Sequence, residues 1–259
     1  VWRLTFRPLI RQGEFIELAG RMLKTLEKAY QHPVDVEFTV HLDNSEVPVR
    51  LNLVQCRPLA TIGDSQPASL PERPDPRRLL MASEGRFMGG NINLAITRII
   101  RIDAAIYANL NINQRYDVAR RVGEVVRESS VSTLLIGPGR WGTSSPELGV
   151  PVRFADIAGV SALVEVSENA GDMVPDLSYG SHFFQDLVET GIAYVALFPE
   201  SDQCRYRPDL LPGEISQPDN ASDIERAVRV YVTDQTPLQL TGDVVRQELV
   251  CYRPVDPKQ

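Results

Sequence analysis

The sequence has few cysteines, fewer basic than acidic residues and no long hydrophobic run. Its 259 residues include 3 widely separated cysteines, Cys56, Cys204 and Cys251, so neither a disulfide framework nor the paired spacing of a zinc site is indicated. The 27 basic and 34 acidic residues give a net charge of −7, which provides no positive field to gather nucleic acid. No apolar stretch approaches the roughly 20 residues that span a membrane, and no signal peptide is recognisable. These absences predict a cytoplasmic protein that binds neither nucleic acid nor membrane.

What the sequence does contain is enough apolar material for two modest domains, with 43% hydrophobic and 24% charged residues. Residues 60–78 hold four prolines and little apolar content, which is typical of a linker. We therefore predict a first domain over 1–60, a linker over 61–78 and a second domain over 79–259. The chain begins abruptly at Val1, so we expect it to be a piece of a longer protein.

Residues 1–60 show the pattern of a helix followed by a hairpin. Apolar residues recur every three or four positions between Gln12 and Tyr30, which predicts an amphipathic helix with one buried face. The strict alternation in "VDVEFTV" and its return in "RLNLVQCRP" predict two strands of a β-hairpin over 34–58.

Strand and helix patterns are mixed in the second domain. Short apolar runs predict strands at 78–83, 98–103, 132–137, 161–166, 192–198 and 227–234, and amphipathic patterns predict helices at 113–129 and 181–190. The fold class that follows is α/β or α+β, with a mixed sheet in the second domain.

Three polar residues of the hairpin would share one face if its strands pair, because strand side chains alternate with a period of two. They are Glu37 on the first strand and Gln55 and Arg57 on the second. A carboxylate and an amide oxygen suit Mg²⁺, and a guanidinium binds phosphate oxygens. The alternative, which the spacing leaves open, is that all three are solvent-facing residues of an ordinary hairpin.

The whole phrase "VDVEFTV" followed by "LNLVQCRPL" resembles the closing segment of the ATP-binding domain of phosphoenolpyruvate synthase and pyruvate phosphate dikinase, which has an ATP-grasp fold. The resemblance covers about the first 60 residues, with Val54 at a position where the family has leucine. It implies that Glu37 and Gln55 coordinate the Mg²⁺ of Mg-ATP and that Arg57 contacts phosphate.

Other parts of that family are missing from this sequence, namely the glycine-rich ATP-grasp half, the phosphorylatable histidine segment and the phosphoenolpyruvate-binding barrel. Phosphoryl transfer depends on several positioned elements at once. We therefore expect a fragment of an ATP-dependent phosphotransferase that is inactive by itself. The alternative is a non-catalytic α/β module that binds a small anion or a protein.

A glycine-rich loop, "LLIGPGRWGTSSPELG", follows an apolar strand in the second domain. Gly137, Gly139 and Gly142 surround Arg140, and Ser145 with Pro146 would start a helix, an arrangement that favours a phosphate or carboxylate ligand. An ordinary tight turn explains the same residues. The loop, "SEGRFMGGNI" and "SYGSHFFQDL" resemble a region that follows the ATP-binding domain in bacterial phosphoenolpyruvate synthase-like proteins.

His182 lies at the predicted start of the helix over 181–190 and would join Arg140 in one polar pocket, although a structural histidine fits the position equally well. Glu84 and Glu165 are acids that would face the same pocket, with salt bridges or solvent as the alternative explanation.

Overall fold

The computed structural model describes residues 10–11, 13–31, 33–41, 50–58, 70–71, 74–168, 170–171, 177–178, 187, 189–233 and 236–255. The chain divides into two compact units, Val1–Ala60 and Thr61–Gln259.

The first unit consists of one helix and one hairpin. Helix α2 spans Gly13–Tyr30, and strands β1 (Val34–His41) and β2 (Arg50–Pro58) pair antiparallel. The predicted helix and both predicted strands are confirmed. The helix packs on both strands, but among its described side chains only Phe15 is buried, and the centroid of its ring lies 6.2 Å from that of Phe38. The helix face predicted to be buried is therefore covered only in part.

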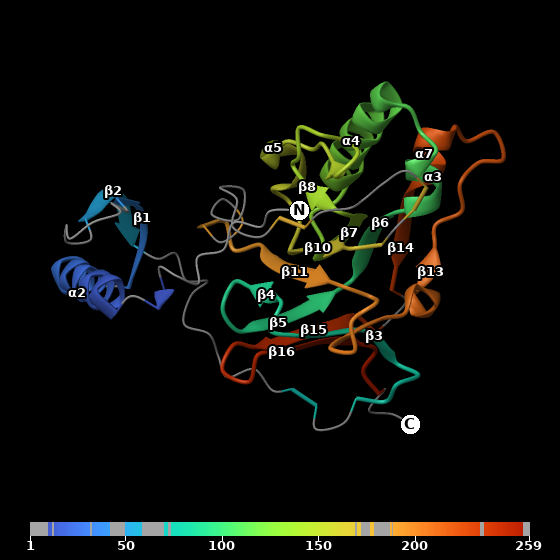
Figure 1. Cartoon of the computed structure of the whole chain (residues 1–259). Helices are drawn as coiled ribbons and strands as arrows, with labels where there is room; N and C mark the ends of the chain where they lie inside the picture. The colour runs from blue at the N-terminus through green and yellow to red at the C-terminus, as the bar shows by residue number, and fades with distance from the viewer. Residues whose placement is uncertain are drawn as a thin grey trace. The chain divides into compact units, whose positions relative to one another are not determined.

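The second unit has two packed sheets with helices on one side (Figure 1). A separate parallel pair is formed by two short strands, β8 (Arg140–Trp141) and β9 (Gly149–Val150). Its larger sheet has seven strands in the order β13-β14-β6-β7-β10-β11-β4, and its smaller sheet has five in the order β12-β3-β16-β15-β5. The larger sheet contains β4 (Phe87–Met88), β6 (Arg98–Ile102), β7 (Thr133–Pro138), β10 (Ala162–Val166), β11 (Ala193–Leu197), β13 (Gly213–Glu214) and β14 (Val228–Val232). The smaller sheet contains β3 (Leu79–Glu84), β5 (Ile92–Ile96), β12 (Cys204–Tyr206), β15 (Leu238–Asp243) and β16 (Glu248–Tyr252).

Four central strands of the larger sheet, β6, β7, β10 and β11, run parallel in chain order, and every residue of β7, β10 and β11 is buried. A strand that is covered on both faces has a continuous run of apolar residues, which is why these strands could be predicted from the sequence. One face packs on helices, with Leu135 and Leu163 against Val118 and Val122. The confirmed fold class is mixed α/β.

The other face of the larger sheet packs on the smaller sheet. Leu134, Ile136 and Val164 lie in one core cluster with inner residues of the smaller sheet such as Leu240 and Leu249. The alternating burial of β16, with Leu249 and Cys251 buried, reflects a strand with one covered face.

Helices occupy the connections between the parallel strands and the segment before β14. They are α3 (Ala104–Ala108), α4 (Ile112–Arg127), α5 (Phe154–Ile157) and α7 (Asp223–Ala227), with a 3₁₀ turn η1 at Pro208–Leu210. Asn111 caps α4 by accepting from the backbone N–H of Gln114, whose side chain accepts from Asn111 N–H in return. This capping box begins α4 close to the predicted start of the helix.

Several expectations for the second unit differ from the structure or lie outside its described part. Strands β4, β5, β12, β13, β15 and β16 were not predicted from the sequence. The segment behind the glycine loop, residues 145–148, is a turn closed by Leu148 N–H to Ser145 O at 2.9 Å, so the expected helix start there is wrong. The linker at 61–78 and the helix at 181–190 fall largely outside the described residues. Of the helices that the structure describes, none combines the length and the apolar content of a membrane span.

Candidate functional site

The hairpin of the first unit places its polar residues in two directly opposed pairs. Glu37 on β1 faces Gln55 on β2, and Asp35 faces Arg57 in the same register. Because residues two apart on a strand point to the same side, all four side chains share one face. The arrangement expected for Glu37, Gln55 and Arg57 is therefore present in the structure.

Asp35 is the member of this group that the sequence did not single out. Its Oδ2 atom accepts from Arg57 Nη2 at 3.2 Å and from Arg57 Nε at 3.4 Å. The Arg57 side chain is 25% exposed and that of Asp35 is 40% exposed, so this ion pair lies at the edge of solvent. Asp35 and Glu37 are two positions apart on one strand and therefore point to the same side, which is the sequence signal that could have revealed Asp35.

A β-bulge lies directly beside the Glu37–Gln55 pair. The register shifts between Glu37 and Phe38, which pairs with Leu53, so Val54 is the extra residue on β2. Bulges increase local twist and re-aim neighbouring side chains, and they are frequent beside active sites. Val54 is 63% exposed at this bulge.

The donor set of the hairpin fits Mg²⁺ that arrives with a nucleotide. Directly opposed residues in an antiparallel pair have Cβ atoms about 4.5–5.5 Å apart, which lets the oxygens of Glu37 and Gln55 reach one ion. Within the described ranges no three His, Cys, Asp or Glu side chains form a metal-binding group. Mg²⁺ needs no such cage, since it is commonly bound by one or two carboxylates together with substrate phosphates and water.

The glycine loop of the second unit is built around Trp141. Gly137 lies under the indole, because a Cβ atom placed on it would be 2.4 Å from Trp141 Cζ2. The Trp141 side chain is 1% exposed, and its Nε1 atom donates to Val164 O at 3.0 Å. Gly139 and Gly142 have φ of 65° and 75°, the left-handed region that favours glycine. These glycines are explained by packing and turn geometry.

The backbone N–H groups of this loop are used within the protein. Those of Gly139, Arg140 and Gly142 donate to carbonyl oxygens at 2.9–3.0 Å, and that of Trp141 donates to the carboxylate of Glu165 at 2.9 Å. An anion cradle needs such groups to point at the ligand. These backbone N–H groups are therefore not available to bind the expected anion, and the segment expected to begin a helix behind them is a turn. A ligand role for the half-buried Arg140 side chain stays a prediction.

Glu165 is a buried acid that holds the loop in place. It is 0% exposed and lies opposite Gly137 in the register of β10 with β7. Its carboxylate accepts from Trp141 N, from the N–H and hydroxyl of Ser178, and from the Tyr194 hydroxyl, at 2.6–2.9 Å. Burial raises the pKa of Glu165 above its ordinary value, and these four hydrogen bonds oppose the shift. The network accounts for both carboxylate oxygens.

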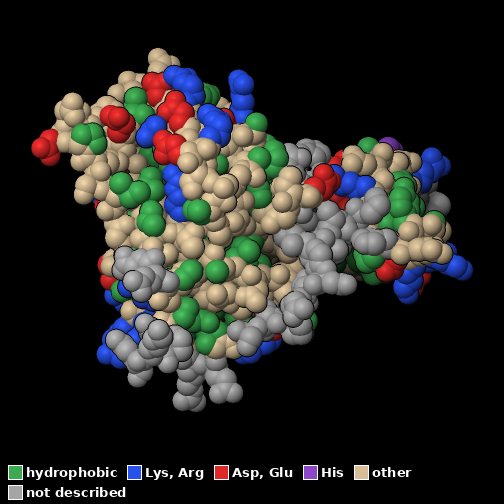
Figure 2. All heavy atoms as spheres, turned by 180° about the vertical axis from the view of Figure 1, so that it is seen from behind, with side chains coloured by type: hydrophobic (Ala, Val, Ile, Leu, Met, Phe, Trp, Pro, Cys, Tyr) green, Lys and Arg blue, Asp and Glu red, His purple; other side chains and the backbone are tan. Residues whose placement is uncertain are grey.

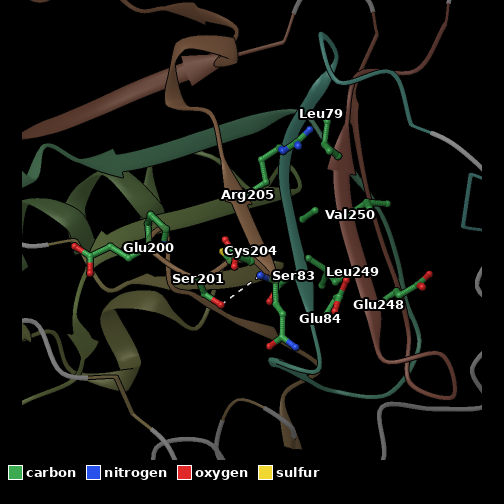
Figure 3. A pocket seen from close by; sticks show the side chains of 14 residues that line it. Leu79, Ser83, Glu84, Glu200, Ser201, Cys204, Arg205, Glu248, Leu249 and Val250 are labelled. Atoms are coloured by element: carbon green, nitrogen blue, oxygen red, sulfur yellow. Dashed lines mark hydrogen bonds between the residues drawn. The ribbon is translucent and has the colours of Figure 1, made fainter.

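Of the other two candidates, only Glu84 is among the described residues. His182 is outside the described residues, so its expected partnership with Arg140 stays a prediction. Glu84 lies at the end of β3, where it lines a cavity of about 520 Å³ beside β12 and β16 (Figure 3). That cavity is lined by four acids and one arginine, which are Glu84, Glu200, Asp202, Glu248 and Arg205. This negative charge disfavours the phosphate or carboxylate ligand expected for the second domain.

A helix packed on a hairpin, with opposed Glu–Gln and Asp–Arg pairs, is the arrangement on which the nucleotide-binding prediction rests. Comparison with protein families matches residues 7–77 to the family described as pyruvate phosphate dikinase, AMP/ATP-binding domain. The matched stretch includes α2, β1 and β2 and supports a relationship to the pyruvate phosphate dikinase and phosphoenolpyruvate synthase family. Neither the comparison with curated proteins nor that with solved structures gave a match.

Proposed function

We propose that the first unit is part of the ATP site of a pyruvate phosphate dikinase-like, ATP-dependent phosphotransferase. The observation that carries the proposal is the opposed pair Glu37–Gln55 beside the pair Asp35–Arg57, on one hairpin face within the residues matched by the AMP/ATP-binding family. In this proposal the chain contributes ligands to Mg-ATP and does not complete phosphoryl transfer by itself.

Each side chain has a separate role in the proposed site. Glu37 and Gln55 supply a carboxylate and an amide oxygen to Mg²⁺, which neutralises charge on the nucleotide phosphates. Arg57 donates to a phosphate oxygen, and its ion pair with Asp35 restricts the guanidinium to the face that carries Glu37 and Gln55. Asp35 is thus a positioning residue.

Exposed apolar residues of the first unit support its assignment as part of a larger site. Hydrophobic side chains lie at the surface of this unit in the space-filling view (Figure 2). Among the described ones, Ile16 is 49%, Leu53 44% and Val54 63% exposed. Of the residues described in this unit, Phe15 is the one buried hydrophobic residue, which is a small core for a helix and two strands, so further protein surface would be needed to cover this unit.

Isothermal titration with Mg-ATP tests the proposal. The unmodified chain should bind Mg-ATP more tightly than ATP in EDTA, and Glu37→Gln should weaken Mg-ATP binding by about tenfold or more, because a metal ligand loses its charge. Glu27→Gln on the exposed part of α2 is the matched control and should leave the affinity unchanged.

Arg57 requires a second comparison because it also forms an ion pair. Arg57→Gln should weaken binding with and without Mg²⁺, since its proposed contact is with phosphate. Asp35→Asn removes the ion pair but keeps the guanidinium, so it should cost less affinity than Arg57→Gln. Equal losses from the two variants, or Mg-ATP affinity unaffected by Glu37→Gln, would contradict the assigned roles.

A further inference from the structure

Arginine side chains meet at a second cavity, of about 490 Å³, within the second unit. Arg77 and Arg78 come from the segment before β3, and Arg253 follows β16. Two hydrogen bonds fix these segments together, from Arg253 N–H to Arg78 O at 2.9 Å and from Arg78 Nη1 to Pro254 O at 3.1 Å. These bonds hold the two segments that line the cavity next to each other.

The charge at this cavity is positive after its internal ion pairs are counted. The one acid among the described lining residues, Asp209, accepts two hydrogen bonds from Arg207, of 2.8 and 2.6 Å. Arg77 pairs with Asp75, while Arg78 donates to a carbonyl oxygen and not to a carboxylate. Among the described residues Arg253 has no ion-pair partner. Within the part of the chain that the structure describes, the carboxylates of Asp75 and Asp209 are thus paired with Arg77 and Arg207, and Arg78 and Arg253 are in no ion pair.

The positive charge of the cavity is opposite in sign to the net charge of the second unit, because residues 61–259 contain 27 acidic and 19 basic side chains. The remaining lining is suited to an organic group. Leu210 and Leu211 provide an apolar wall, and Thr236 provides a hydroxyl. Small-molecule sites commonly combine an apolar wall with a few placed polar groups in a volume of this order.

We propose that this cavity binds the phosphoryl group of a small phosphomonoester. Two uncompensated guanidinium groups match the double negative charge of such a group near neutral pH, whereas a monocarboxylate needs only one. Arginine also presents paired N–H groups that match phosphate oxygens. The ester's organic part contacts Leu210 and Leu211. The site is separate from the hairpin and does not depend on the function proposed for it.

An NMR titration of the full chain with phenyl phosphate, inorganic phosphate and benzoate tests this site. Phenyl phosphate should bind saturably and most tightly, inorganic phosphate more weakly because it lacks the apolar group, and benzoate weakest because it carries one charge. Arg253→Gln should weaken phenyl phosphate binding at least tenfold. The Arg253 side chain is exposed and its backbone N–H is retained in the variant, so the fold should be unaffected.

Arg153→Gln is the matched control, since Arg153 is also an exposed arginine but lines a different cavity. It should bind phenyl phosphate like the unmodified chain, as should Glu37→Gln, which separates this proposal from the ATP site. Absence of saturable phenyl phosphate binding, equal affinity in Arg253→Gln and the unmodified chain, or benzoate binding as tight as phenyl phosphate would each overturn the proposal.

Discussion

At the scale of single residues, Glu165 shows how one buried carboxylate determines the geometry of a whole loop. Its oxygens accept from β8 through Trp141 N–H, from Ser178, and from β11 through the Tyr194 hydroxyl. Replacing it leaves buried donors without acceptors, each at a cost of roughly 1–3 kcal/mol. We therefore expect Glu165→Ala to lower the free energy of unfolding by about 3 kcal/mol or more, measured by urea denaturation.

The raised pKa of Glu165 also predicts a pH dependence of stability. An acid whose folded pKa lies above its unfolded value binds a proton more readily in the folded state. Its contribution to stability is therefore largest below the ordinary pKa of 4.5 and falls as the pH rises through the raised folded value. Urea titrations across this range should show the fall in the unmodified chain and a smaller slope in Glu165→Gln. Identical slopes in both proteins would contradict the assignment.

At the scale of elements, the turn from β7 to β8 depends on the contact between Gly137 and Trp141. A methyl group at Gly137 would overlap the indole, so the ring or the strand must move. Gly137→Ala should lower the free energy of unfolding by about 1–3 kcal/mol, as overpacking does in well-packed cores. Gly213 in β13 is the matched control, because a Cβ atom there has no described neighbour within 4 Å. Comparable losses from Gly137→Ala and Gly213→Ala would argue against the packing explanation.

The elements that the sequence predicted are those with a strong local pattern. Helix α4 has an amphipathic stripe, and β7, β10 and β11 are apolar throughout because both sheet faces are covered. By contrast, β15 and β16 are joined by a turn that places Gln247 at a φ of 57°, where a hairpin signal would have glycine or asparagine. Strands of two residues such as β4 exist only through pairing with distant strands, which a local pattern cannot reveal.

The three sites considered also differ in how far a local sequence pattern reveals them. The shared face of Glu37, Gln55 and Arg57 was predictable because these residues lie on neighbouring strands with a clear period of two. The glycine loop was misjudged in part, because the sequence shows its glycines but not the acceptors that occupy its N–H groups. The arginine cavity was missed because Arg78 and Arg253 are brought together only by the tertiary fold.

At the scale of the whole molecule, the two units differ greatly in the size of their cores. The first unit has one buried hydrophobic side chain among its described residues, whereas the second has two extensive clusters of buried hydrophobic residues. We expect urea unfolding in two steps, with the first unit unfolding at the lower concentration. A Trp2→Phe variant would leave Trp141 as the fluorescence probe of the second step, while circular dichroism follows both steps. Coincident transitions by the two probes would contradict this expectation.

The ligand dependence of this unfolding links stability to the proposed function. A ligand that binds only the folded first unit stabilises it by about 2.7 kcal/mol at a concentration 100 times its dissociation constant. Mg-ATP should therefore shift the first step and leave the step reported by Trp141 unchanged. Glu37→Gln should reduce that shift without changing the transition in the absence of nucleotide.

The most direct test of the hairpin as part of an ATP site is a measurement of where the metal lies. In amide NMR spectra of the full chain, Mn²⁺ with ATP in place of Mg²⁺ broadens signals from residues near the ion. We predict selective loss of the signals of Asp35 to Glu37 and Gln55 to Arg57, and retention of those signals in Glu37→Gln. Unchanged hairpin signals, or broadening confined to residues of the second unit, would contradict the proposed ATP site.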